Sequence, residues 1–346
     1  MRRRRRPQKE RSRKHTMTRC FAVACCALVS HLALAHDACP SRGDLSPLYC
    51  DEDRDLIADA PKDKAKWRNP ASLMLSYSPQ EDTAAYEKLW APYVTHMSQC
   101  LGRSTRFLQV FSSAAAIEAL RSGRIQFSLL ATGDTPFAVN VGGAVPFAGI
   151  GDANTLLGYH VVVLVKHESN FKKLAELKGK RVAHTTPSSN SGNMAPRALF
   201  PAEGLTPDKD YKVIYSGKHD NSIMGVLNGD YDAAAVADDV LDRMLSRGLV
   251  KTGSFRVIYK SKSFPAGSMV HAHDLDETLS ARLKSCTFSY AFSADLRTAF
   301  QGSDRFVPMN YQRDFESVRN VAQNSGAASL RPGFDGGNGK KRESGK

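Results

Sequence analysis

The residues best suited to chemistry form a short polar run, SSNSGN, at positions 188–193. The run follows a predicted strand over residues 180–186 and precedes a predicted helix over residues 194–200. The first N–H groups of a helix have no partner within it, and the helix dipole adds partial positive charge there. Such amides, with hydroxyls beside them, can bind a small anion. The predicted anion-binding turn consists of Ser188, Ser189, Asn190 and Ser191. An ordinary helix cap is the alternative, although one serine would suffice for it.

Two further segments bring polar side chains to the same edge of a predicted sheet. His219 follows a predicted strand over residues 211–215 and stands at the start of a helix. Asp238 and Asp239 follow a predicted strand over residues 231–237. The carboxyl ends of parallel strands meet at one edge, where open α/β sheets bind their ligands. We therefore predict that these three side chains lie beside the polar turn.

The chain contains two stretches that align without gaps, residues 120–134 and 226–240. In each, a predicted helix ends at a glycine and a buried strand follows. We interpret the pair as one α/β unit used twice, once in each of two lobes, although helix–glycine–strand segments are common enough to match by coincidence. The first copy ends in Thr132, Gly133 and Asp134, which are therefore predicted site residues.

The order of the predicted elements indicates an α/β fold with two lobes. Apolar strands over residues 158–166 and 255–261 are predicted to cross between them. The predicted divisions are an arm over residues 36–70, a first lobe over 71–159 and 258–324, a second lobe over 160–257, and a disordered tail over 325–346. Polar helix starts on the facing edges of two lobes describe a ligand trap that closes about a hinge. Closure would bring Ser113 and Thr132 toward the polar turn and His219.

The basic charge of the chain is concentrated near its start. The formal net charge is +13, but residues 1–35 hold ten of the 48 basic residues and one of the 35 acidic residues. Residues 20–34 are apolar but too short to span a bilayer, and Ala33-Leu34-Ala35 fits a cleavage site. We predict a signal peptide over residues 1–35, beginning at Met1 or Met17, and export to the periplasm. The remaining charge carries no basic block, so no nucleic-acid partner is predicted.

Cleavage after Ala35 would leave four cysteines. An even number in an oxidising compartment favours disulfides, and Cys39 and Cys50 are the predicted pair because they lie close in sequence. Cys100 and Cys286 form either a second pair or two free thiols. The spacing of cysteine and histidine residues does not indicate a metal, so neither a metal nor another cofactor is predicted. We expect a monomer.

The motifs of the chain resemble those of a known family. TPSSNSGNMAPRALFP and YSGKHDNSIMGVLNGDYDAAAVADDVLDR are similar to segments of the solute-binding proteins for phosphonate, phosphite and related oxyanions. The resemblance runs from about residue 67 to residue 308 and includes YSPQED, EALRSGR, ATGDT and FAVN. It implies a type II periplasmic binding fold serving an ABC transporter. It also implies that the serine loop and His219 bind the anion, that an acidic residue of the site falls at Asp238 or Asp239, and that Ser113 replaces a binding aromatic.

One departure from the family bears on the ligand. Phosphonate binders of the family carry a Pro-Asn-Asp turn whose carboxylate pairs with a substrate ammonium, whereas residues 264–268 here are FPAGS. This difference places the sequence nearer the phosphite-binding and arsenite-sensing members. An aminoalkyl phosphonate such as 2-aminoethylphosphonate is therefore expected to bind more weakly than a compact oxyanion.

These observations predict a binding protein that delivers a small oxyanion, namely phosphite, a phosphonate or a phosphate-like ion, to an ABC transporter permease. The alternative is a periplasmic sensor subunit, of the arsenite-binding type, that acts on a membrane histidine kinase. A hydrolase using Ser189 or Ser191, His219 and Asp238 would lack the G-x-S-x-G elbow. The chain is therefore predicted not to be an enzyme.

Overall fold

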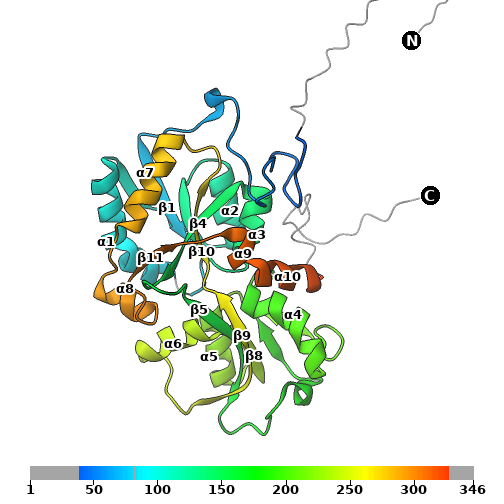
Figure 1. Ribbon diagram of the computed structural model, residues 1–346. Helices are drawn as coiled ribbons and strands as arrows, with labels where there is room; N and C mark the ends of the chain where they lie inside the picture. The colour runs from blue at the N-terminus through cyan, green and yellow to red at the C-terminus, as the bar shows by residue number, and fades with distance from the viewer. Residues whose placement is uncertain (1–38, 82, 327–346) are drawn as a thin grey trace, which may run out of the picture. The chain divides into compact units, whose positions relative to one another are not determined.

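The computed structural model describes residues 39–81 and 83–326 of the chain. The predicted signal peptide, its cleavage site and residues 327–346 of the predicted tail lie outside these residues. Within these residues the chain forms one unit built on two sheets, each with helices packed against it (Figure 1). We call the elements around the first sheet the first lobe and those around the second sheet the second lobe. Over the described residues no helix is long and apolar enough to cross a membrane.

The first sheet has six strands in the order β11-β4-β10-β3-β1-β2. Its strands are β1 (Ser72–Tyr77), β2 (Ser104–Phe107), β3 (Phe127–Leu130), β4 (Ala144–Gly151), β10 (Ser268–Ala272) and β11 (Arg305–Pro308). β1 pairs in parallel with β2 and β3, whereas β10, β4 and β11 join in antiparallel pairs. β3 is buried along its whole length, as expected for a strand covered on both faces.

The second sheet repeats this plan with five strands in the order β7-β6-β8-β5-β9. Its strands are β5 (Gly158–Lys166), β6 (Val182–His184), β7 (Val213–Tyr215), β8 (Ala233–Ala237) and β9 (Phe255–Pro265). β6 pairs in parallel with β7 and β8, and β5 runs antiparallel to both β8 and β9. In both lobes, therefore, parallel strands end at the same edge.

The helices cover both faces of the sheets. The first lobe contains η1 (Lys64–Lys66), α1 (Thr83–Leu101), α2 (Ser113–Arg121), α3 (Asp134–Gly142), α7 (Glu277–Phe288), α8 (Ala294–Ala299), α9 (Tyr311–Asp314) and α10 (Glu316–Asn324). The second lobe contains η2 (Leu174–Leu177), η3 (Asn190–Met194), α4 (Ala195–Leu199), η4 (Phe200–Glu203), α5 (His219–Asn228) and α6 (Asp238–Ser246). In Figure 1, α1 and α7 lie on one side of the first sheet, while α2 and α3 lie on the other.

The predicted α/β repeat agrees with the structure. Gly123 follows α2 and Gly229 follows α5, and their φ angles of 78° and 89° are left-handed, as glycine after a helix permits. The strands that follow, β3 and β8, occupy equivalent places. Each pairs with a parallel strand on one side and with an antiparallel strand on the other.

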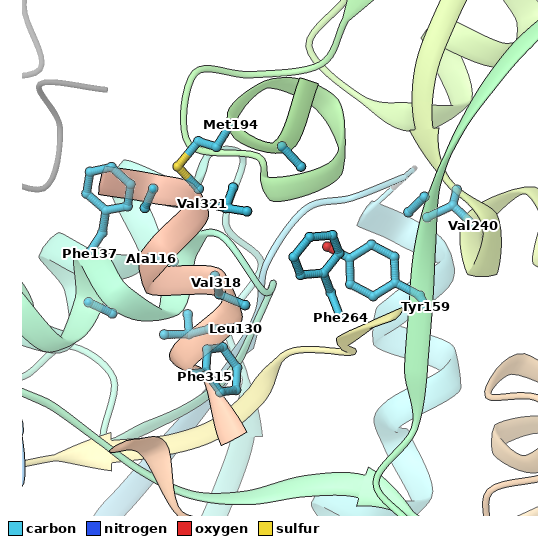
Figure 2. Packing of buried hydrophobic residues seen from close by; sticks show 14 of the residues in the cluster. Ala116, Leu130, Phe137, Tyr159, Met194, Val240, Phe264, Phe315, Val318 and Val321 are labelled. Atoms are coloured by element: carbon cyan, nitrogen blue, oxygen red, sulfur yellow. The ribbon is translucent and has the colours of Figure 1, made fainter. Parts of the chain in front are cut away.

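The crossings between the lobes differ in detail from the prediction. The second sheet extends from residue 158 to residue 265, because β9 continues to Pro265 instead of ending near residue 261. The predicted C-terminal helix over residues 311–324 divides into α9 and α10, and α10 contacts α4 and η3 of the second lobe. Figure 2 shows Met194 of η3 directed toward α10, which carries the buried residues Val318 and Val321. A third segment of the chain thus packs against both lobes.

One disulfide closes a loop of the arm, and a second joins two helices of the first lobe. Cys39 and Cys50 are bonded, as predicted, and lie in the arm before β1. Cys100 of α1 is bonded to Cys286 of α7, which decides between the two alternatives for that pair. α1 also contributes an apolar face to the core, with Trp90 only 1% exposed.

Three local differences affect the site. The predicted helix over residues 194–200 begins earlier, as a π-helical turn at Asn190. α3 and α6 were not expected, and they begin at Asp134 and Asp238 respectively. Carboxylates predicted to follow strands therefore stand at the first positions of helices.

Candidate ligand-binding site

A cleft of ≈ 1310 Å³ lies between the two lobes, and residues of both line it. The helix starts of α2 and α3 border it from the first lobe, and those of η3, α5 and α6 border it from the second. The helix dipole adds partial positive charge at each helix start, so five of them around one cleft favour a bound anion. The predicted site residues that line it are Ser113, Thr132, Gly133, Asp134, Ser188, Ser189, Asn190, Ser191, His219 and Asp239.

Each side chain of the polar turn has its own role. Ser189 caps η3 by accepting a hydrogen bond from the Gly192 amide at 3.0 Å, which is the ordinary cap considered as the alternative. Ser188 donates to Asp134 across the cleft, and the Asn190 amide group donates to the Tyr159 hydroxyl. Ser191 lies 3.5 Å from His219 Nε2. The Ser191 hydroxyl and the first amides of η3 are therefore the groups of this turn best placed for a ligand.

His219 is the first residue of α5 and is 4% exposed. The amide of Ala237 donates to its Nδ1 at 3.3 Å, so the proton of the neutral ring belongs on Nε2. Burial lowers the pKa of His219 to about 4, which keeps the ring neutral near pH 7. The ring therefore offers one N–H donor on the side of Ser191.

This arrangement suits binding rather than nucleophilic catalysis. A Ser–His pair activates serine only when the histidine nitrogen facing the hydroxyl can accept its proton. In His219 that nitrogen, Nε2, carries the proton, and Nδ1 is bonded to a backbone amide instead of an orienting carboxylate. The geometry agrees with the prediction that no hydrolase triad forms from Ser191, His219 and Asp238.

Asp134, the first residue of α3, links the two lobes. Its carboxylate accepts hydrogen bonds from Ser78 at 2.9 Å, Ser113 at 2.6 Å and Ser188 at 2.9 Å. Burial raises the pKa of Asp134, and the three serine hydroxyls act against that rise. Ser78 and Ser113 belong to the first lobe and Ser188 to the second, so this carboxylate holds the two lobes together.

Gly133 permits the close approach of the lobes at the same point. A Cβ atom at this position would lie 2.0 Å from the carbonyl oxygen of Ser188 and 2.5 Å from the amide nitrogen of Asn190. Its φ of −69° is open to any residue, so the glycine is needed here for space alone. Thr132, beside it, donates to the carbonyl of Pro265 at 2.7 Å, where β9 ends.

Asp238 does not line the cleft, which corrects the prediction for this residue. Its carboxylate accepts from the backbone amide of His160 at 2.7 Å, and it pairs with the His160 ring and with Lys260. The reason is that α6 starts at Asp238, which turns this side chain toward β5 and β9. Asp239, one residue later, faces the cleft instead.

Asp239 belongs to a buried ionic network that also joins the lobes. Its Oδ2 accepts from Arg243 at 2.9 Å, and Arg243 donates to Glu81 of the first lobe at 2.7 Å. Arg247 pairs with the other oxygen of Glu81. Two carboxylates thus balance two guanidinium groups. Asp239 Oδ1 is buried and has no hydrogen-bond partner among the described residues, so it remains able to accept one.

Tyr159 is a site residue that was not predicted. It lies on β5, lines the cleft and is 4% exposed. Burial raises the pKa of Tyr159 to about 12, so its hydroxyl remains protonated. The sequence did not reveal this role, because a tyrosine on an apolar strand is typical of a core residue. Only the alternation of side chains along β5, which directs Tyr159 to the cleft, distinguishes it from such a residue.

Comparisons with known proteins identify relatives of this chain. The family described as ABC transporter, phosphonate, periplasmic substrate-binding protein matches residues 75–315. The phosphate-import protein PhnD of Mycolicibacterium smegmatis is 27% identical over 232 residues, covering 63% of this chain and 71% of that protein. The phosphonates-binding periplasmic protein of Escherichia coli is 23% identical over 251 residues, covering 68% and 74%. Neither relative supports the sensor alternative.

The fold has counterparts among solved structures. A binding protein component of an ABC phosphonate transporter from Pseudomonas aeruginosa superimposes with a TM-score of 0.66 at 19% identity, covering 74% of this chain and 87% of that one. The methylphosphonate complex of a PhnD protein from Prochlorococcus marinus gives 0.65 at 19% identity, covering 74% and 98%. These likenesses show the two-lobed type II periplasmic binding fold.

Proposed function

This chain belongs to the periplasmic phosphonate-binding proteins of ABC transporters, and we propose that it closes on one small oxyanion and delivers it to the transporter permease. The main support for this proposal is a group of hydrogen-bond donors at the cleft: the neutral His219 ring, the Ser191 hydroxyl and the first amides of η3. Neutral donors at helix starts bind anions without a permanent positive charge on the site.

The proposed compartment is the periplasm, reached through a signal peptide cleaved after Ala35. Two disulfides are in keeping with that oxidising compartment. We further propose that the protein acts as a monomer.

The proposed ligand carries a protonated oxygen. Asp239 Oδ1 is a buried acceptor without a donor, and an unsatisfied buried acceptor is costly. A P–OH group would supply the missing hydrogen bond, whereas a fully ionised oxyanion would meet only repulsion there. Phosphite, phosphate and methylphosphonate can each carry such a proton.

The proposal excludes a strong preference for aminoalkyl phosphonates. An ammonium in the cleft would need a counter-charge. Asp239 already shares its charge with Arg243, and the Asp134 carboxylate already accepts hydrogen bonds from three serines. The resemblance to the family implies that the aspartate of its turn would fall at position 267, but an aspartate there does not fit this backbone. Gly267 has a φ of +86°, and a Cβ there would lie 2.3 Å from the carbonyl oxygen of Leu130. The departure from the family turn is therefore built into the main chain.

Replacement of His219 tests the proposal. Hydrogen bonds to charged groups contribute about 1.5–3 kcal/mol, so His219→Ala should weaken phosphite and methylphosphonate binding by at least about tenfold. His271 provides the matched control, because it is equally buried, its pKa is also lowered to about 4, and it does not line the cleft. His271→Ala should reduce thermal stability but retain affinity. Native circular dichroism with unchanged affinity in His219→Ala would remove this residue from the site.

A further inference from the structure

A second group of oxygen ligands lies outside the cleft, in the arm before β1. Residues 51–59 have the sequence DEDRDLIAD, with five acidic residues and one arginine. One carboxylate oxygen from each of Asp51, Asp53 and Asp55 lies within 4.8 Å of the other two. The lysine of this region, Lys62, pairs with Glu52. Three carboxylates at this separation repel one another unless a cation lies between them.

The burial of Asp51 distinguishes this group from an ordinary acidic surface. Asp51 is 2% exposed, and its Oδ1 has no hydrogen-bond partner among the described residues. Its other oxygen accepts from the amide of Leu56 at 3.2 Å. A buried carboxylate oxygen without a donor is unfavourable by itself. A bound cation would supply the missing interaction.

The spacing matches that of a calcium-binding loop. In the 12-residue loop of that type, ligands come from positions 1, 3 and 5, a main-chain carbonyl at position 7 and a residue at position 9, with a left-handed turn at position 6. Counted from Asp51, these positions are Asp53, Asp55, Ile57 and Asp59, and the turn is Leu56 with a φ of 72°. Position 12 is Lys62, so the usual bidentate glutamate is missing.

The loop is fixed at both ends. The disulfide from Cys39 ends at Cys50, directly before Asp51, and the Asp59 amide donates to the carbonyl of Cys50 at 2.8 Å. The arm in turn contacts the first lobe, where the amide of Ser46 donates to the carbonyl of Asn140 in α3. The three aspartates are thus held in place before any ion binds.

We propose that Asp51, Asp53 and Asp55 bind one calcium ion, with Ile57 and Asp59 as further oxygen donors of the same loop. An all-oxygen ligand set selects a hard cation, and the absence of histidine and cysteine from the loop disfavours zinc. The ion stabilises the arm on the first lobe. Because the loop does not line the cleft, this site is independent of the bound oxyanion.

The test uses the purified chain with both disulfides intact, after treatment with EDTA. Calcium chloride is titrated by calorimetry, and thermal unfolding is followed with calcium or with sodium chloride of equal ionic strength. We expect a dissociation constant of about 10⁻⁴–10⁻³ M, the range of extracellular loops, and a midpoint that rises with calcium only. Asp53→Asn and Asp55→Asn, at exposed positions, should each weaken calcium binding at least about tenfold. Neither should change oxyanion affinity.

Glu52→Gln is the matched control. It removes one negative charge from the same loop, but Glu52 lies between ligand positions and pairs with Lys62. Its calcium affinity should stay within about twofold of the unmodified chain. Equal losses in Glu52→Gln and Asp53→Asn would show attraction to the net charge of the loop and would overturn the proposal. No binding heat and no shift in unfolding at about 10 mM calcium, ten times the weak end of the expected range, would overturn it as well.

Discussion

Replacing Gly133 with alanine should hold the lobes apart. The added methyl carbon would lie 2.0 Å from Ser188 O and 2.5 Å from Asn190 N, both main-chain atoms of the second lobe. Carbon atoms in ordinary contact stand about 3.5–4.0 Å apart, so the lobes must separate by about 1–1.5 Å at this point. The separation would also lengthen the hydrogen bond from Ser188 to Asp134, which is now 2.9 Å.

The expected size of the effect follows from the cost of overpacking. Inserting a methyl group into a packed contact costs about 1–3 kcal/mol, which corresponds to a loss of affinity of about 5- to 150-fold. The cost falls on the closed form alone, since the contact is absent when the lobes are apart. The free energy of unfolding without ligand should therefore change little.

The assay combines calorimetry of methylphosphonate binding with small-angle X-ray scattering. The unmodified chain should bind and contract on binding, whereas Gly133→Ala should bind more weakly and contract less. Gly142→Ala is the control, because Gly142 lies on the same helix and its added methyl would meet Cγ2 of Ile117, within the first lobe, at 3.0 Å. If Gly133→Ala binds and contracts like the unmodified chain, the lobes do not close through this contact.

Two further predictions concern charge. Asp239→Asn replaces a hydrogen-bond acceptor by a group that can also donate. The affinity for methanesulfonate, which has no P–OH group, should therefore rise relative to the affinity for methylphosphonate. If calorimetry finds the ratio of the two affinities unchanged, Asp239 is not the group that selects the ligand. Burial lowers the pKa of His184, His219 and His271 to about 4, so between pH 6.5 and pH 4 the unfolded chain binds more protons than the folded chain. Thermal stability should accordingly decrease as pH falls through this window, and a midpoint that stays constant from pH 7 to pH 4.5 would contradict these shifts.

The fold was largely predictable because its signals are local. Buried strands bounded by glycine and polar turns predicted the second sheet, and the aligned stretches predicted that the first lobe contains an equivalent unit. The extent of β9 was not predictable, because exposed residues interrupt this strand and it has no continuous apolar run such as that of β5. The contact of α10 with the second lobe depends on packing between distant segments, such as Val321 and Met194, which a sequence pattern does not record.

The site was predicted at the level of segments rather than of atoms. The polar turn and His219 stand at helix starts, as their surroundings indicated. Asp238 and Asp239 could not be told apart, because their directions depend on where α6 begins. The saturation of Asp134 by three serines requires residues from three segments to meet. The D-x-D-x-D spacing at residues 51–55 is visible in the sequence, but the burial of Asp51 is not.

The central claim, that the cleft binds a compact oxyanion, is tested most directly by competition calorimetry on the unmodified chain. Phosphite and methylphosphonate should each bind with a stoichiometry of one, and 2-aminoethylphosphonate should displace them only at much higher concentration. A buried ammonium without a free counter-charge costs several kcal/mol, which corresponds to at least about a hundredfold difference. If 2-aminoethylphosphonate binds as tightly as phosphite, or if neither compact oxyanion binds, the account of this site is contradicted.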